Sequence, residues 1–417
     1  MTQSINFMFR NLIYKQKKFT LFIGQIFALN PVSGIFEIDT SRLRFRVFSF
    51  RCIFTIVSVI CQTIFLGYCI YEVFNSSAVF LSKGTSIMFY GTNCLTTICF
   101  LRIAKQWPAL CRHISKTEGA DPNPDYSLIN RCNLTCIVIL SLALVEHILS
   151  DLAVISVSID CYPNDVIFER FIKISFPWIF NYITYNHFVG TLAMLINLQC
   201  TFNWNFADVF VICISYYLTS RLEQINKRIS TISVKYVPSS LWRVMREDYC
   251  RVVQLIRRID DVINGVIFIS FANNLYFICV QLLHTLEDGL KVLYFCLPLK
   301  GYEHAIYFVY SFIFLMSRSL AVSLIAARVH SATLDSAPAL YEVPSPVYCI
   351  EVQRLIDQIN GDTVSLSGLN FFNVKRGLVL SIAGTIITYE LVLIQFSGVT
   401  PTVPTNATLL ANVTETA

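Results

Sequence analysis

Seven long apolar segments constrain this chain more than any other feature. A helix needs about 20 residues to cross the hydrocarbon core of a bilayer, and segments of this kind cover residues 48–70, 79–103, 134–156, 174–198, 262–286, 305–327 and 378–397. An eighth run, residues 206–218, is shorter and contains Asp208, so we interpret it as a buried or amphipathic helix outside the membrane. Hydrophobic residues make up 55% of the 417 residues and charged residues only 14%, which excludes a soluble domain. The sequence therefore predicts an all-α, polytopic membrane protein with seven transmembrane helices.

The distribution of basic residues predicts the orientation of these helices. Most of the 32 Lys and Arg residues lie near the N-terminus and in residues 102–131, 221–258 and 318–376, all on one side of the membrane. The positive-inside tendency makes that side intracellular, which places the N-terminus inside and the C-terminus outside. The glycosylation sequons at Asn75, Asn406 and Asn412 lie on the predicted outer side, whereas the sequon at Asn133 lies on the inner side and disagrees.

This orientation divides the chain into alternating membrane and cytoplasmic parts. The expected parts are a cytoplasmic N-terminal segment (1–47), transmembrane helices 1–4 with their loops (48–204), a cytoplasmic helical extension (205–261), transmembrane helices 5–6 (262–327), a cytoplasmic linker and helix (328–376), transmembrane helix 7 (377–398) and an extracellular tail (399–417). Within the extension, residues 217–229 show the apolar spacing of an amphipathic helix. Such a helix either packs on its own subunit or joins subunits, and the sequence leaves both interpretations open.

The last apolar segment carries a stripe of polar residues. Ser381, Thr385, Thr388 and Gln395 are spaced by 4, 3 and 7 residues, which places them on one side of a helix otherwise made of Leu, Ile and Val. These side chains either bond to a neighbouring helix or face water in a pore formed by several copies. Spacing alone favours the first interpretation. Glu390 lies off the stripe, and we expect it to contact protein because a carboxylate in lipid costs several kcal/mol.

Polar and aromatic residues in the other segments are candidates for a ligand pocket open to the outer side. The candidate residues are Tyr90, Asn93, Glu146, His147, Asp151, Trp178, Tyr182, Tyr185, Asn274, Gln281 and His284. Trp178, Tyr182 and Tyr185 would form an aromatic stripe on a helix, which serves either packing or a ligand. His147 and Asp151 share a helix face, so they form either an internally satisfied ion pair or part of the pocket. The Cys and His spacing indicates no zinc site, and we expect no metal or cofactor.

A motif in the last segment adds a resemblance to a known family. The run Thr388-Tyr389-Glu390-Leu391-Val392-Leu393-Ile394-Gln395-Phe396 resembles the TYhhhhhQF signature of insect gustatory receptors, in the form carried by the sweet-taste branch. Residues 362–372, 384–387, 327–332, 274–278 and 27–31 are similar to the same branch. The resemblance covers most of the chain and is most specific in its C-terminal third.

The resemblance implies a function and a set of partners. It implies a sugar-gated, weakly selective cation channel of four subunits in the plasma membrane of gustatory receptor neurons, and not an enzyme. Mono- or disaccharides would be the ligands, monovalent and divalent cations the permeants, and the tetramer would be homomeric or formed with related subunits within membrane lipids. The last helix would line the pore, with Gln395 and Phe396 at its gate. Basic residues form no long block, so we expect no nucleic-acid partner.

Two other functions of multi-pass membrane proteins are alternatives to a channel. A G-protein-coupled chemoreceptor also has seven helices, but no D/E-R-Y follows the third segment, no NPxxY closes the seventh, and the charge distribution opposes an outer N-terminus. A secondary transporter would show repeat-related polar breaks, and the sequence shows no internal repeat. The acidic residues of segment 134–156 could serve a proton relay, which is the feature that favours a transporter.

Overall fold

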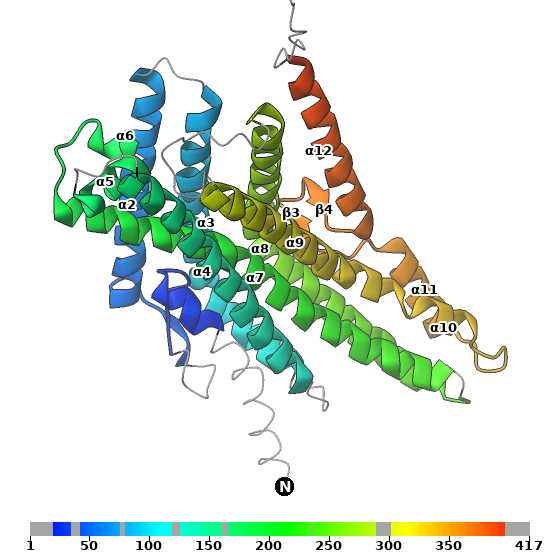
Figure 1. Cartoon of the computed structure of the whole chain (residues 1–417). Coiled ribbons are helices and arrows are strands. Elements are labelled where there is room, and N and C mark those ends of the chain that lie inside the picture. Colours follow the sequence, from blue (N-terminus) through cyan, green and yellow to red (C-terminus); the bar gives the residue numbers. More distant parts are fainter. Residues whose placement is uncertain are drawn as a thin grey trace, which may run out of the picture.

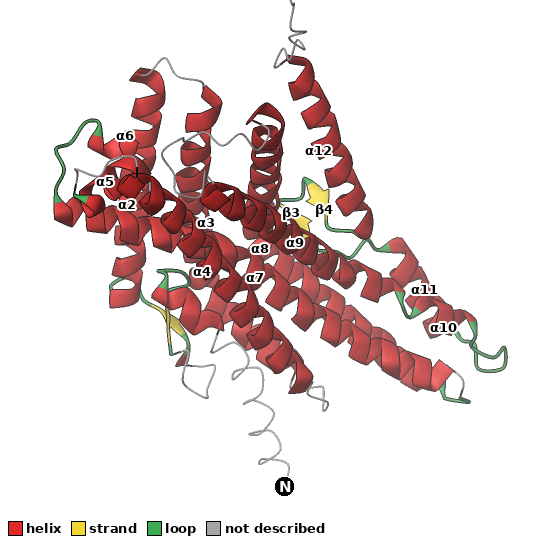
Figure 2. Ribbon diagram, in the orientation of Figure 1, coloured by secondary structure: helices red, strands yellow, loops and turns green. Residues whose placement is uncertain are grey.

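Long helices dominate the structure. The computed structural model describes residues 20–34, 42–75, 80–118, 126–160, 166–233, 235–288 and 302–396, and the side chains of residues 80–83, 116–118, 126, 160, 284–288, 302–303, 390 and 393–396 lie outside this description. Its longest elements are α2 (Phe50–Asn75), α3 (Phe80–Glu118), α4 (Tyr126–Asp160), α7 (His187–Ser233), α8 (Ser239–Asp288), α9 (Tyr302–Leu334) and α12 (Arg376–Phe396). Figures 1 and 2 show these helices as one elongated bundle, with α12 at its edge.

The burial pattern is that of a protein whose solvent is lipid. Helix α2 buries Thr55, Ser58 and Gln62 while Ile53 and Ile60 stay exposed, the reverse of a helix on a water-soluble domain. Among the described residues, α2, α3, α4, α8 and α9 are long and apolar enough to cross a membrane, and α12 contributes a shorter apolar stretch. The chain is therefore a multi-pass membrane protein.

One of the expected transmembrane segments is wrong. Residues 174–198 do not form a single helix, because the chain ends α5 (Ile167–Ser175), makes the four-residue helix α6 (Pro177–Phe180) and then turns before α7 starts at His187. Pro177 lacks a backbone N–H and its ring would clash with the carbonyl four residues earlier, so α5 cannot continue through it. Each of the other six segments overlaps one long helix over nearly all of its described residues.

The run 206–218 is not a separate helix. It continues α7, and this part of α7 is almost wholly buried. Farther along α7, Leu222, Ile225 and Ile229 are buried in the main core of their own subunit, together with residues of α8 and α9. The amphipathic face of residues 217–229 thus packs on its own subunit. Two short helices, α10 (Ala337–Tyr341) and α11 (Ile350–Gly361), join this core through Leu340, Val352 and Leu355.

Two small antiparallel ladders complete the described fold. Strand β1 (Val32–Ser33) pairs with β2 (Arg44–Phe45), ahead of α2. Strand β3 (Ser367–Gly368) pairs with β4 (Phe372–Asn373), so Ser367 lies opposite Asn373. Between β3 and β4, Leu369 and Asn370 adopt a left-handed backbone with φ of 48° and 61°, which reverses the chain tightly. This hairpin leads directly into α12.

Candidate functional site

A buried ion pair lies at the centre of the bundle. The Nε atom of Arg318, on α9, lies 2.9 Å from Oδ2 of Asp208, on α7, and the two side chains are 2% and 0% exposed. Arg318 also donates to Oδ1 of Asn205, and its guanidinium carbon lies 4.6 Å from the ring centre of Trp204. Two opposite charges so deeply buried are tolerable only because each compensates the other.

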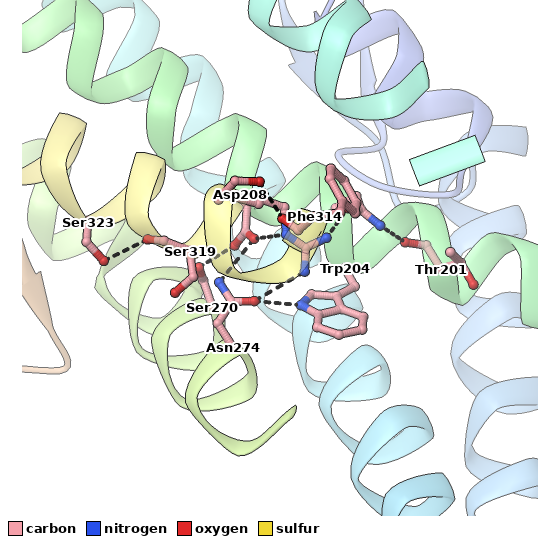
Figure 3. Close-up of polar contacts among 11 residues, drawn as sticks. Thr201, Trp204, Asp208, Ser270, Asn274, Phe314, Ser319 and Ser323 are labelled. Atoms are coloured by element: carbon pink, nitrogen blue, oxygen red, sulfur yellow. Dashed lines mark hydrogen bonds and ion pairs between the residues drawn. The ribbon is translucent and has the colours of Figure 1, made fainter. Parts of the chain in front are cut away.

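Helix α8 completes this cluster, which Figure 3 shows. Asn274 donates to Oδ2 of Asp208 at 3.1 Å, and its Oδ1 accepts from Trp204 Nε1 at 3.1 Å and from Arg318 Nη2 at 3.3 Å. Ser270 donates to the other carboxylate oxygen of Asp208. The cluster therefore fastens α7, α8 and α9 to one another at one level of the bundle.

A polar pocket adjoins this cluster. The residues that line it come from α3, α7 and α8, and they are Thr92, Asn93, Thr96, Trp204, Ala207, Ile269, Ser270 and Asn273. Trp204 and Ser270 belong to both the pocket and the cluster. None of the lining side chains carries a charge. The pocket is narrow in this conformation, with no room for a water-sized sphere.

One polar atom of this pocket has no partner. Asn93 is 1% exposed, and its amide nitrogen donates to the carbonyl of Phe89 at 2.9 Å. Its Oδ1 atom accepts no hydrogen bond from any described residue. Thr92, in contrast, donates to Oδ1 of Asn273 at 3.1 Å. A buried acceptor without a donor is unfavourable by about 1–3 kcal/mol, so Asn93 can gain from a ligand hydroxyl.

The structure also brings Tyr90 and Trp178 together. Their ring centres lie 5.9 Å apart in an edge-to-face arrangement, and the Tyr90 hydroxyl donates to Oδ1 of Asn197 at 3.3 Å. The indole nitrogen of Trp178 is buried and has no hydrogen-bond partner among the described residues. Asn93 follows Tyr90 on α3 by three residues, so the Tyr90 ring of this pair belongs to a helix that also lines the pocket.

The expected aromatic stripe of Trp178, Tyr182 and Tyr185 is wrong. Because the helix breaks after α6, only Trp178 is on a helix, and the two tyrosines lie on the turn that follows it. Tyr182 donates to Oε2 of Glu72 at 2.5 Å, and the Tyr185 hydroxyl lies 2.9 Å from Nδ1 of His187. Neither tyrosine is among the residues that line the pocket beside Asn93.

Other candidate residues gather around Ser311 of α9. Ser311 donates to Oε1 of Glu146 at 2.5 Å and accepts from Gln281 Nε2 at 2.9 Å. His147 and Asp151 contact each other, as their spacing indicated, with 3.5 Å between Nε2 and Oδ2. Of the described pocket candidates, only Asn93 lines the pocket between α3, α7 and α8, while Asn274 belongs to the central cluster. The candidates therefore do not form one cavity. The side chain of His284 lies outside the described residues.

Among the described residues, the Ser and Thr hydroxyl groups of α12 form hydrogen bonds only within their own helix. Ser381, Thr385 and Thr388 each donate to the carbonyl four residues earlier in α12, and all three are exposed. The stripe is thus open to a helix of another chain or to water. The side chains of Glu390, Gln395 and Phe396 lie outside the described residues, as do Asn406 and Asn412, while Asn75 is exposed at the end of α2.

Sequence reasoning missed the central pair. It placed Asp208 outside the membrane and counted Arg318 among the cytoplasmic basic residues, although Arg318 lies inside the apolar segment 305–327. The sequence did contain a signal for this pair. A charged residue inside an apolar run needs a partner of opposite charge, and Asp208 and Arg318 each lie in such a run.

Comparison with solved structures places this arrangement in a known fold. The insect olfactory receptor OR5 from Machilis hrabei matches with a TM-score of 0.67, at 13% identity, over 90% of this chain and 97% of that chain. A structure of the same receptor in complex with eugenol also matches, with a TM-score of 0.67 over 93% of this chain and 99% of that chain at 12% identity. At such low identity the likeness concerns the fold.

Sequence relatives identify the family. The gustatory receptor for sugar taste 64a of Drosophila melanogaster is 32% identical over 390 residues, which cover 90% of this chain and 82% of that protein. The gustatory receptor 5a for trehalose of the same organism is 31% identical over 396 residues, covering 94% of this chain and 86% of that protein. These relatives are receptors and not enzymes, and the resemblance to the sweet-taste branch is confirmed. Because the trehalose receptor family model also matches residues 1–402, this chain belongs to that family of insect gustatory receptors.

Proposed function

We propose that this protein is one subunit of a sugar-gated, weakly selective cation channel in the plasma membrane of gustatory receptor neurons. The observation that carries the proposal is the uncharged polar pocket between α3, α7 and α8, which lies beside a cluster whose buried charges are paired. Membership of a family whose relatives are receptors for sugar taste and for trehalose supports a sugar as the ligand.

The chemistry of the pocket matches that of a neutral sugar. Sugar hydroxyls need hydrogen-bond partners in a dry site, and Thr92, Asn93 and Asn273 offer hydroxyl and amide groups without charge. The C–H faces of a sugar pack well on aromatic rings such as Trp204 and Tyr90. Since the pocket is closed in this conformation, a sugar enters only as α3 and α8 separate, and that separation is the movement we propose to open the channel.

The arrangement of α12 supports a pore between copies. Four subunits, identical or related, would turn the exposed hydroxyls of Ser381, Thr385 and Thr388 toward a common axis, where neutral dipoles select only weakly among cations. Phe396 would close the pore by dewetting, with Gln395 beside it. This arrangement uses seven membrane crossings, an intracellular N-terminus and an extracellular tail that can be glycosylated at Asn406 and Asn412.

Whole-cell recording tests the proposal. Cells that express the chain receive a panel of mono- and disaccharides while G-protein signalling is blocked, and we expect inward currents whose reversal follows the cation gradient. Asn93→Ala should reduce the response, whereas Asn360→Ala, an exposed amide bonded to the Tyr341 hydroxyl, should not. Currents that vanish with the G-protein block, or an unchanged response in Asn93→Ala, would contradict the proposal.

A further inference from the structure

A short linker, residues 362–375, joins α11 to α12. Three polar contacts attach this linker to α8 and α9. Arg257, on α8, pairs with Asp362 at 2.9 Å. His330, on α9, lies with Nδ1 3.0 Å from the carbonyl oxygen of Val364. Asp260, again on α8, holds the β3–β4 hairpin itself. The linker is thus attached to α8 at two points and to α9 at one.

The contact of Asp260 with the hairpin is the most enclosed of the three. Oδ1 of Asp260 accepts the backbone N–H of Ser367 at 2.7 Å, and Oδ2 accepts the Ser367 hydroxyl at 2.6 Å. Asp260 is 9% exposed, whereas the side chains of Arg257 and Asp362 are about half exposed. A carboxylate that uses both oxygens on one residue fixes orientation as well as distance. We call this pair of bonds the Asp260 clasp.

Aromatic packing holds the other face of the hairpin on the same helix. The ring of Phe372 lies 5.6 Å from that of Phe271 and 6.4 Å from that of Phe268, between ring centres. Phe371 lies 5.7 Å from Phe268. The hairpin therefore sits on one stretch of α8, held by polar bonds from Asp260 and by tilted aromatic rings from Phe268 and Phe271.

Helix α8 carries both the clasp and one wall of the pocket. Asp260 and Ser270 are ten residues apart, which corresponds to about 15 Å along a helix, and α8 is unbroken between them. Farther on, α12 packs against α8 and α9, with Leu378 and Ile382 near its start against the core, while Leu380 and Ile387 are exposed. The start of α12 is therefore held both by this packing and by the hairpin that precedes it.

We propose that Asp260 is a positioning residue whose clasp transmits movement of α8 to the last helix. This inference rests on the proposed function, because it assigns the route by which a change at the pocket reaches the pore. When the pocket wall shifts, the clasp carries the hairpin with it, and the hairpin turns the first residues of α12. Without the clasp, α12 keeps only its direct packing on α8 and α9, and its start follows a movement of α8 less closely.

Hydrogen-exchange mass spectrometry on the purified full-length protein tests the clasp itself. In Asp260→Ala the Ser367 N–H has no acceptor, and we expect exchange in residues 364–374 to rise by about tenfold, with residues 350–359 unchanged. Asp260→Asn keeps an oxygen for the N–H and an amide for the hydroxyl, so it should exchange like the native protein. Asp261→Ala removes the exposed neighbouring carboxylate and is the matched control.

Current and binding measured on the same variants test the coupling. Asp260→Ala should raise the sugar concentration for half-maximal current about tenfold, or abolish the current, while sugar binding to the purified protein stays within about twofold of native. Asp260→Asn should restore the current. Faster hairpin exchange with unchanged currents would overturn the coupling role, and unchanged exchange in Asp260→Ala would overturn the clasp. If the native protein conducts no current under any sugar, the proposed function is refuted instead. The hydrogen-exchange result would still show whether Asp260 holds the hairpin.

Discussion

Replacing Arg318 with Met should destabilise the bundle strongly. Arg318 and Asp208 are 2% and 0% exposed, so the substitution leaves a buried carboxylate without its counter-ion. Removing one partner of a buried pair costs about 3–5 kcal/mol. Ser270 and Asn274 still donate to Asp208, which compensates part of the charge. We therefore expect a loss near the lower limit, about 3 kcal/mol, in the free energy of unfolding.

Titration of the purified protein with SDS in mixed micelles measures this loss. The matched control is Arg328→Met, since Arg328 forms an ion pair with Glu223 at 2.6 Å on the surface, where such a pair contributes about 0–1 kcal/mol. The double variant Asp208→Asn with Arg318→Met removes the unpaired charge and should regain at least half of the loss. If Arg318→Met is no less stable than Arg328→Met, the reasoning on the central ion pair is refuted.

Three further predictions concern sugar binding, the gate and the contact between α8 and α11. Trp178→Ala should weaken the sugar response while surface labelling stays normal, because Trp178 packs on Tyr90 of α3, and a native dose-response curve would show that Trp178 takes no part in the response. Phe396→Ala should raise the current without sugar, and an unchanged closed state would count against the gate assignment. The Arg246 guanidinium, 2.6 Å from Glu351, holds the pKa of that carboxyl below its usual range, so the pair stabilises α11 above the ordinary glutamate pKa of about 4.3 and ceases to do so as pH falls through the lowered value. The melting temperatures of native protein and Glu351→Gln should therefore differ at neutral pH and converge in acid, and a difference independent of pH would contradict this.

The sequence predicts those helices whose length and apolar composition are set by the thickness of the lipid bilayer. Six expected segments lie in long helices because a spanning helix must satisfy its own backbone and present apolar side chains over its whole length. The fourth segment was wrong because the apolar count over residues 174–198 does not register that Pro177 interrupts the helix. Helix α7 also contains buried Asn205 and Asp208, which lowered its apolar signal.

The site could be predicted in residue type but not in arrangement. Tyr90, Asn93 and Trp178 were chosen for their chemistry, and their mutual contacts follow from how α3 and α6 pack. Periodicity within one segment cannot reveal a contact between two segments far apart in sequence, and Arg318 with Asp208 is such a contact. Asp260 escaped notice for the same reason, since its partner Ser367 lies 107 residues later.

The central claim is that α12 of this family member lines a path for ions that a sugar opens. Purified protein, reconstituted in a planar lipid bilayer without other proteins, tests it most directly by single-channel recording. The account predicts discrete cation currents when a neutral mono- or disaccharide is added, and larger sugar-free currents for Phe396→Ala. If protein that is shown to be folded and inserted conducts no current under any saccharide of the panel, the central claim is contradicted.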